Sequence, residues 1–387
     1  VFSAFSDPIA AASIAQVHRA QLRETGETVA VKILRPGIDR AFRRDIDAFY
    51  FAARMVEVLA PGARRLRPTD VIAHFEGVVM GELDLRLEAA SASEFAANTS
   101  DDDGFQLPEV HWHLSSRRVM TMSWAGGVPM GDNAALDAAG HDRAELGARV
   151  LQLFLSHALR DGYFHGDMHQ GNLKVAPNGD IVAFDFGIMG HIDEYTRRVY
   201  AEIIYGFIRR DYTRVAEVHF EAGYVPRDRD IDAFARALRA VGEPIFGMDA
   251  SRISMGNLLS YLFEVTERFG METRPELILL QRTMVVVEGV ARSLDPQINI
   301  WQVARPVVED YIRKNIGPRA VSRDLGKTLA VLSRYGPRLP GIVENALIRQ
   351  SIPIAPAPKP NRVWPALWAM SGAVTGAAAM AAVFLLG

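Results

Sequence analysis

Three side chains that carry oxygen atoms stand at spacings suited to a magnesium and phosphate site: Asp167, Asn172 and Asp185. Two short apolar runs, 173–176 and 181–184, separate the last two, and an Asn-Gly dipeptide between the runs is a strong hairpin signal. A hairpin would bring Asp185 back beside Asn172. Because Mg²⁺ prefers oxygen ligands and shares them with phosphate and water, these two residues are the predicted metal ligands. Asp167 is close enough in sequence to accept a proton from a nucleophile, or to orient it.

The same segment also permits a different metal site. His165, Asp167 and His169 alternate along the chain, and alternate residues of an extended segment point to one side. Such a set could hold the metal of a hydrolase. This alternative leaves the Asp-Phe-Gly sequence at 185–187 and the upstream Lys32 without a role.

The order of these residues resembles the signature of protein kinases. There, a catalytic-loop Asp is followed by Asn at a fixed spacing and then by Asp-Phe-Gly, as Asp167, Asn172 and 185–187 are here. The usual His-Arg-Asp is His-Gly-Asp, with Gly166 in place of the Arg that would pair with an activation-loop phosphate. The missing Arg therefore weakens the case for a protein substrate, while phosphoryl transfer itself is still predicted.

Lys32 lies in a Val-Ala-Val-Lys sequence of a predicted strand, 28–34, as does the kinase lysine that binds the α- and β-phosphates. A second predicted strand, 15–22, precedes it and follows a loop of small residues. Small residues let a backbone approach phosphates closely, although alanine, unlike glycine, has little access to positive φ. The residues predicted to cover the phosphates are Ala10, Ala11, Ala12 and Ser13. An ordinary hairpin with a lysine-bearing strand would show the same pattern.

Over residues 1–190 the chain resembles the UbiB family, the aarF-domain atypical kinases tied to ubiquinone biosynthesis. The resemblance rests on PIAAASIAQVHRA, VAVKILRPG, a Glu-x-Asp segment at 82–84, FHGDMHQGN and Asp-Phe-Gly. It implies an α+β, two-lobed protein-kinase-like fold, with a small β-rich N-lobe and a large helical C-lobe, that uses ATP and Mg²⁺. The family's Lys-x-Gly-Gln segment is absent and the first residue is Val1, so we expect an N-terminal portion to be missing.

A kinase lysine needs a carboxylate partner on a helix, and Glu82, Asp84 and Glu88 are the candidates for Lys32. The resemblance implies that Glu82 and Asp84 line the site, with Glu88 an alternative partner, and spacing does not choose among them. A solvated acidic helix face would give the same sequence. By the same resemblance, 123–127 is the hinge between the lobes, where backbone groups of Ser123 and Ala125 bind adenine.

Periodicity predicts the remaining elements. Helices are expected at 38–60, 69–99 and 141–160, strands at 110–113 and 118–122, and further helices over 192–350 with breaks at Pro226, Pro244, Pro275, Pro306 and Pro318. In the second helix, a stripe predicted to be core comprises Val71, Phe75, Val78 and Val79. The run at 101–104, Asp-Asp-Asp-Gly, is predicted to be a solvated turn. The predicted domains are an N-lobe at 1–125, a C-lobe at 126–350, a Pro-rich linker at 351–362 and a transmembrane helix at 363–387.

The predicted transmembrane helix has 25 residues without a charge, more than the roughly 20 that cross a bilayer. Lys359 and Arg362 precede it, which places the kinase-like domain on the cytoplasmic side, at a bacterial inner membrane. Gly372 and Gly376 have the spacing that lets two such helices pack closely, which would allow a homodimer through this helix, although Gly and Ala are common in this stretch. A buried apolar hairpin is the alternative for this stretch.

Composition excludes several classes of function. The 387 residues have no cysteine, which rules out disulfides and thiolate chemistry, and a net charge of −3 gives no support to a nucleic-acid partner. We therefore expect a membrane-anchored atypical kinase or ATPase that binds ATP and Mg²⁺ and supports quinone biosynthesis. Its partners would be a membrane lipid or quinone precursor and other quinone-biosynthesis enzymes. The alternatives are a protein Ser/Thr kinase and a non-catalytic, nucleotide-gated scaffold.

Overall fold

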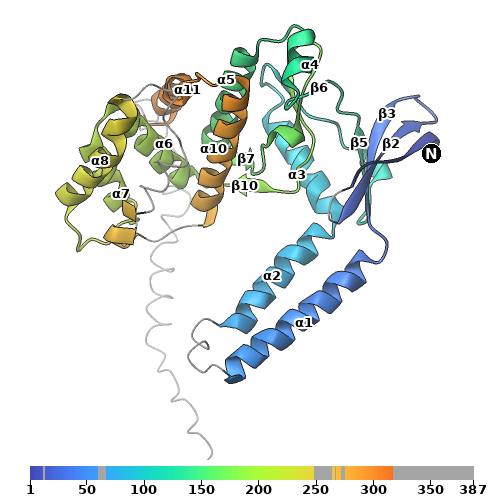
Figure 1. Ribbon diagram of the computed structural model, residues 1–387, viewed down its shortest axis with the longest axis horizontal. Helices are drawn as coiled ribbons and strands as arrows, with labels where there is room; N and C mark the ends of the chain where they lie inside the picture. Colours follow the sequence, from blue (N-terminus) through green and yellow to red (C-terminus); the bar gives the residue numbers. More distant parts are fainter. Residues whose placement is uncertain (12–13, 60–66, 248–263, 266, 272–274, 317–387) are drawn as a thin grey trace, which may run out of the picture. The chain divides into compact units, whose positions relative to one another are not determined.

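The N-terminal part of the chain forms a four-stranded antiparallel sheet (Figure 1). Across the sheet the strands are β1 (Phe2–Ala11), β2 (Ala15–Leu22), β3 (Thr28–Leu34) and β5 (Val119–Ser123). In β3, Val29 and Val31 are buried in a small apolar cluster, and Lys32 points to the other face because strand residues alternate. The computed structural model describes residues 1–11, 14–59, 67–247, 264–265, 267–271 and 275–316.

Two predictions near this sheet are wrong. Ala10 and Ala11 do not belong to a loop: they end β1 and pair with Val17 and Gln16 of β2. The segment 110–113 is not a strand either. It makes one isolated bridge, between Val110 and Met122, before the short 3₁₀ helix η2 (Trp112–Leu114).

Three helices follow β3: α1 (Ile38–Leu59), α2 (Pro68–Glu82) and α3 (Leu85–Asn98). The predicted helix 69–99 is thus two helices, since the Asp84 side chain accepts the hydrogen bond of Arg86 N and caps a new start. α1 and α2 pack as an antiparallel pair (Figure 1). The predicted core stripe is wrong at its N-terminal end, because Val71 and Phe75 are 58% and 43% exposed, whereas Val79 is buried.

The predicted hairpin after the catalytic segment is confirmed as β8 (Leu173–Val175) and β9 (Ile181–Ala183). Its turn contains Gly179 at φ 88°, a left-handed conformation that glycine adopts freely. These strands form the middle of a second sheet, with β4 (Phe105–Gln106) beside β9 and β6 (Val128–Pro129) beside β8.

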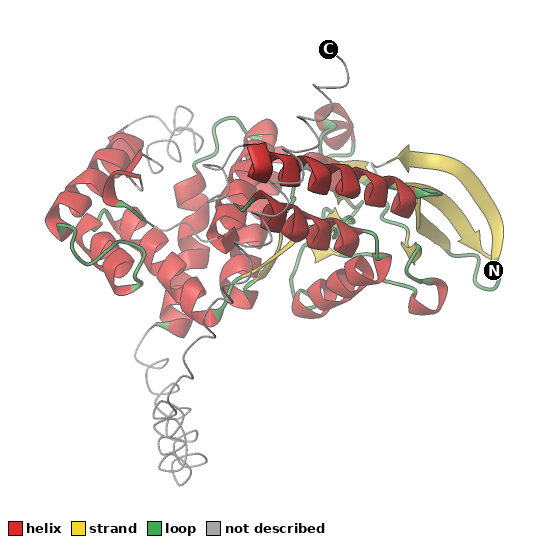
Figure 2. Ribbon diagram, turned by 90° about the horizontal axis from the view of Figure 1, so that it is seen from below, coloured by secondary structure: helices red, strands yellow, loops and turns green. Residues whose placement is uncertain are grey.

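Helices make up most of the remaining described chain (Figure 2). They are α4 (Asn133–Ala138), α5 (Arg143–Ser156), α6 (Glu194–Arg209), α7 (Tyr212–Glu221), α8 (Ile231–Gly247), α10 (Pro275–Leu294) and α11 (Ile300–Asn315). Two predicted breaks are wrong, because α8 continues through Pro244 and α11 through Pro306. A proline removes one backbone hydrogen bond, and packing of α11 against α5 and α6 offsets that loss.

The main apolar core joins α3, α5, α10 and the short strands of the second sheet. Among its fully buried aromatic side chains are Phe95, Phe154, Phe164 and Phe186, the last of which belongs to Asp-Phe-Gly. The predicted linker at 351–362 and the predicted span at 363–387 lie outside the described residues. Within the described ranges, no helix combines the length and apolar character needed to cross a bilayer.

Candidate nucleotide and magnesium site

Lys32 of β3 and Glu88 of α3 form a buried ion pair, with Nζ 2.6 Å from Oε1. The same ammonium lies 3.6 Å from Oδ1 of Asp185. The sheet fixes the position of Lys32. β3 is an inner strand, and Lys32 pairs with Val17 of β2 on one side and with Met120 of β5 on the other. The sequence did not choose among the three candidate carboxylates. In the structure, Glu88 is the one that pairs with Lys32.

Opposite charges keep Lys32 and Asp185 ionised although they are largely shielded from water, whereas burial raises the pKa of Glu88. Burial by itself would lower the pKa of Lys32, but Glu88 and Asp185 outweigh it, and the pKa is raised. Burial would likewise raise the pKa of Asp185, but Lys32 and the N–H of Gly187 outweigh it, and the pKa is lowered. The ammonium and the Asp185 carboxylate are consequently both charged near neutral pH.

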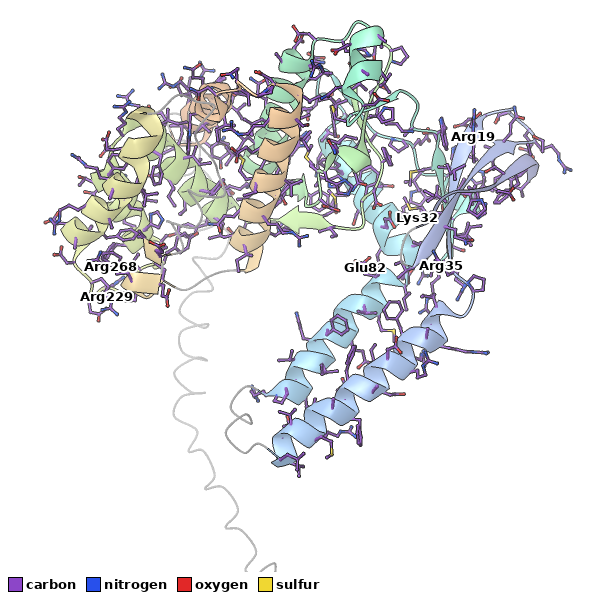
Figure 3. All side chains as sticks on the ribbon, in the orientation of Figure 1. Arg19, Lys32, Arg35, Glu82, Arg229 and Arg268 are labelled. Atoms are coloured by element: carbon purple, nitrogen blue, oxygen red, sulfur yellow. The ribbon has the colours of Figure 1, made fainter. Side chains whose placement is uncertain are left out.

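The other two acidic candidates differ from each other. Glu82 ends α2 near the cluster, close enough for the charges of Lys32 and Asp185 to act on it (Figure 3). Burial is the main reason why the pKa of Glu82 is raised. Asp84, in contrast, caps α3 and forms an ion pair with Arg86 at 2.6 Å. Glu82 lines the site as predicted, and Asp84 has a structural role here.

Hydrogen bonds orient the predicted metal ligands. Asn172 donates its Nδ2 to the carbonyl of Asp167 at 3.0 Å, which leaves Oδ1 as the atom able to coordinate a cation. The N–H of Phe184 donates to the Asn172 carbonyl, so the residue before Asp185 is tied to Asn172. The hairpin thereby brings Asn172 and Asp185 to one end of β8 and β9, as the sequence predicted. One carboxylate and one amide oxygen suit Mg²⁺, whose remaining positions belong to phosphate and water.

The histidines of the catalytic loop serve the backbone. Asp167 N donates to Nδ1 of His165, and Gly171 N donates to Nδ1 of His169, both at 3.0 Å. Burial lowers the pKa of His165 to about 4, so its ring is neutral at pH 7. In the part of the chain that the structure describes, no three His, Asp or Glu side chains are grouped to hold a metal. The histidine-based hydrolase alternative therefore has no geometric support.

Gly166 explains why this loop has no Arg before Asp167. A Cβ at Gly166 would lie 2.9 Å from Cγ2 of Ile188 and 3.1 Å from its carbonyl oxygen, too close for a side chain. The carbonyl of Gly166 also accepts a hydrogen bond, at 2.9 Å, from Oγ1 of the fully buried Thr283 on α10. Sequence reasoning missed Thr283, because no motif marks a buried hydroxyl that supports a loop 117 residues away.

The predicted hinge continues from β5. Oγ of Ser123 accepts a hydrogen bond from Glu109 N, while the carbonyl of Ala125 accepts one from Nζ of Lys174 at 2.8 Å. Lys174 was not predicted to take part in the site. Ala12 and Ser13, the other predicted phosphate-covering residues, lie outside the described residues.

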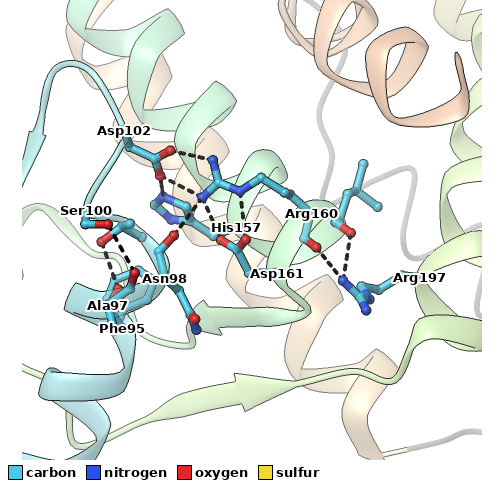
Figure 4. A network of polar contacts seen from close by, with 11 residues as sticks. Phe95, Ala97, Asn98, Ser100, Asp102, His157, Arg160, Asp161 and Arg197 are labelled. Carbon is cyan, nitrogen blue, oxygen red and sulfur yellow. Dashed lines mark hydrogen bonds and ion pairs between the residues drawn. The ribbon is translucent and has the colours of Figure 1, made fainter. Parts of the chain in front are cut away.

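A second polar cluster joins the segment after α3 to the residues that follow α5 (Figure 4). His157, at the end of α5, is fully buried and bonds through Nε2 to Asp102 at 3.0 Å, and Arg160 pairs with Asp102 and Asp161. Burial alone would raise the pKa of Asp102, but the bonds from His157 and Arg160 lower it well below its usual range. The prediction of a solvated turn is wrong for Asp102, which anchors the segment after α3 to the end of α5, just before the catalytic loop.

A sheet-borne lysine paired with a helix carboxylate, beside Asp-Phe-Gly and a catalytic-loop Asp and Asn, defines a protein-kinase-like class of protein. Comparison with known families agrees: an ABC1 atypical kinase-like domain model matches residues 1–219 and a UbiB helical domain model matches residues 238–299. The chain belongs to the UbiB family of atypical kinases.

Three relatives and one structure illustrate the similarity. Proteins named "Probable protein kinase UbiB" are 39% identical in Cronobacter sakazakii, 40% in Xanthomonas euvesicatoria and 37% in Marinobacter nauticus, over 88%, 89% and 90% of this chain. The chain spans 63%, 63% and 64% of the length of those relatives. The solved complex of Rv3197 with erythromycin from Mycobacterium tuberculosis has a TM-score of 0.61 and 26% identity, over 79% of this chain and 78% of that one. It confirms the kinase-like fold with a small β-rich lobe and a helical lobe.

Proposed function

We propose that this protein binds ATP and Mg²⁺ and acts as an atypical kinase or ATPase that supports isoprenoid quinone biosynthesis. The observation that carries the proposal is the contact of Lys32 with Glu88 and Asp185, since this arrangement presents a cation to phosphates beside a metal ligand. Membership of the UbiB family supports the link to quinones.

Each residue has a role that follows from its charge and its place. Lys32 binds the α- and β-phosphates while Glu88 holds its ammonium in position. Asn172 and Asp185 would hold Mg²⁺, which supplies charge neutralisation of the phosphates when bound. Asp167 accepts a proton from the nucleophile or orients it. Ser123 and Ala125 are at the adenine end, and Ala10 and Ala11 precede the segment that would cover the phosphates.

A small molecule or lipid is the acceptor that the catalytic segment favours, with water as the acceptor in an ATPase. Asp-Phe-Gly passes directly into β10 (Met189–His191), which pairs with β7 (Tyr163–His165), and α6 begins at Glu194. The segment between Asp-Phe-Gly and α6 is short, so little of the chain is left there to form a binding surface for a peptide substrate. Protein phosphorylation is the second candidate, and the name of the relatives, protein kinase, is the observation in its favour.

The proposed location is a bacterial inner membrane, with the kinase-like domain cytoplasmic and 363–387 as a single span. This part of the proposal rests on the uncharged sequence alone. The proposed partners are membrane lipid, a quinone precursor and other quinone-biosynthesis enzymes, with a homodimer formed through the same helix.

The test is ATP hydrolysis with Mg²⁺ by the full chain in liposomes. We expect phosphate release that rises when lipid or a quinone precursor is added and falls at least about 100-fold in Asp185→Asn and in Asp167→Asn. The Asn variants keep the size of each side chain and remove only its charge.

Binding without turnover would favour the non-catalytic scaffold. In that case the wild type would bind nucleotide in a calorimeter yet release no more phosphate than the two variants. Lys32→Ala tests in cells what the two hypotheses share: if nucleotide binding is lost while quinone synthesis continues, both the enzyme and the nucleotide-gated scaffold are contradicted.

A further inference from the structure

His169 lies two residues after Asp167, at the start of the 3₁₀ helix η4 (Gln170–Asn172). Its Nδ1 accepts the hydrogen bond of Gly171 N at 3.0 Å, and this bond caps the helix. A ring nitrogen that accepts carries no proton, so the neutral imidazole has its N–H at Nε2. That atom lies 3.5 Å from Oδ2 of Asp167. The bond to the backbone thus presents an N–H donor to the predicted catalytic carboxylate.

Gly171 makes room for this ring. A Cβ at Gly171 would lie 2.8 Å from Cε1 and 2.9 Å from Nδ1 of His169, closer than a side chain can approach. Any other residue there would displace the ring from the backbone N–H and move Nε2 relative to Asp167. The pair is also open to a substrate, since the side chains of His169 and Asp167 are 48% and 34% exposed.

Other groups fix the main chain of Asp167 but not its carboxylate. Its N–H donates to Nδ1 of His165, and its carbonyl accepts from the N–H of His169 and from Nδ2 of Asn172. The carboxylate can still turn about its own side-chain torsions. A general base needs one oxygen aimed at the proton that it accepts, and the contact with Nε2 of His169 is the one that acts on this orientation.

We propose that His169 is a positioning residue for the reaction: Nε2–H donates to Oδ2 of Asp167, which leaves Oδ1 to receive the proton of the nucleophile. The inference rests on the proposed function, in which Asp167 acts on the nucleophile. As the oxygen of the nucleophile bonds to the γ-phosphorus and the bond to ADP breaks, its proton moves to Oδ1, while the proton on Nε2 stays in place. Catalytic hydrogen bonds that are long before the substrate binds often shorten in the complex.

Two substitutions separate the tasks of the two ring nitrogens. In His169→Asn the amide oxygen takes the place of Nδ1 and keeps the cap, but the donor at Nε2 is lost. In His169→Gln the amide N–H takes the place of Nε2, and the cap is lost. For ATP hydrolysis by the full chain with Mg²⁺ in liposomes, we expect kcat to fall about 10- to 100-fold in His169→Asn while the KM for ATP changes less than about threefold. His169→Gln should regain most of that kcat.

A double variant tests whether His169 acts through Asp167. Added to Asp167→Asn, His169→Asn should lower the remaining single-turnover rate by less than about twofold, because the effects of residues that act as a unit are not additive. His113→Asn, at an exposed histidine of η2, is the matched control and should leave both kcat and KM unchanged.

Three results would overturn this role and spare the proposed function, provided that turnover still depends on Asp167. They are an unchanged kcat in His169→Asn, equal losses of kcat in His169→Asn and His169→Gln, and a loss in the double variant as large as that from His169→Asn alone. A wild type without turnover would overturn the proposed enzyme and this inference together.

Discussion

The nucleotide site and the helical region from α6 to α8 are stabilised in different ways. Around the site, polar contacts join residues that are far apart in sequence, as in Lys32 with Glu88 and Thr283 with Gly166. The apolar cluster of α7 and α8 is local, and ion pairs such as those of Arg214 with Glu202, Glu217 and Glu221 join residues of one helix or of two consecutive helices.

This difference predicts different sensitivities to substitution. A buried charge that loses its partner keeps the cost of leaving water without the compensating attraction, typically about 3–5 kcal/mol. Exposed ion pairs are screened by solvent and contribute about 0–1 kcal/mol each. Polar substitutions near the site should therefore reduce stability as well as activity, while removal of an exposed ion pair in α6 to α8 should cost at most about 1 kcal/mol and leave activity unchanged.

The largest effect is expected for Lys32→Met. It leaves Glu88 buried without its partner and should lower the free energy of unfolding by about 3 kcal/mol, as well as abolish ATP turnover. Urea denaturation at fixed pH measures the loss. The double variant Lys32→Met/Glu88→Gln removes both charges and should regain most of that stability, but no activity. Equal destabilisation in the single and double variants would contradict a coupled ion pair.

The loss of stability in Asp102→Ala, compared with that in Arg214→Ala, tests the difference between the two regions directly. Without Asp102, the buried His157 and the Arg160 guanidinium lose a shared acceptor, which should cost about 2 kcal/mol or more. Arg214 also has several carboxylate partners, but its side chain is 40% exposed, so Arg214→Ala should cost at most about 1 kcal/mol. Thermal unfolding of both variants gives the order, and a larger loss in Arg214→Ala would reverse the comparison.

Acid should weaken both regions through one buried histidine in each, His165 in the catalytic loop and His219 in α7. Burial lowers the pKa of each to about 4, whereas a histidine in an unfolded chain titrates near about 6.5. Between these values the unfolded state binds more protons, so stability falls with decreasing pH by about 1.4 kcal/mol per pH unit for each residue.

His219 is the histidine to replace, because its Nδ1 lies 2.7 Å from the carbonyl of Val215 and a glutamine amide can donate there instead. In His219→Gln the dependence of stability on pH between 6.5 and 5 should become shallower by about 1 kcal/mol per pH unit. The measurement is urea denaturation at several pH values. His74→Gln, on the exposed side of α2, is the control, and a similar change there would rule out burial as the cause.

The sequence predicted the site better than its surroundings. Spacing and an Asn-Gly turn gave Asp167, Asn172, Asp185 and the hairpin that joins the last two, and the Val-Ala-Val-Lys motif gave Lys32, because motifs, turn chemistry and strand period are local properties. The choice of Glu88 over Asp84 depended on which carboxylate faces Lys32 after α2 ends, and that required a cap at Asp84 which periodicity does not detect.

Contacts between residues that are far apart in the sequence could not be predicted from it. Asp102 reads as part of a solvated acidic turn until His157 and Arg160, more than 50 residues later, are placed beside it. Lys174 reads as an ordinary strand residue until Ala125 is in contact. Such pairs have no period or motif, so only the fold reveals them. The predictions for 351–387 stay predictions, as those residues lie outside the described part.

The smallest effect is expected at the outer stripe of α2, where periodicity predicted core and the structure has exposed side chains. Val71 is 58% exposed, so Val71→Gln should change the free energy of unfolding by no more than about 0.5 kcal/mol. Val79, on the same helix, is 8% exposed, and Val79→Ala removes two buried methyl groups, worth about 1.5 kcal/mol. A loss in Val71→Gln as large as that in Val79→Ala would mean that another surface covers this face of α2 in solution, because a valine that contacts only water has no burial energy to lose.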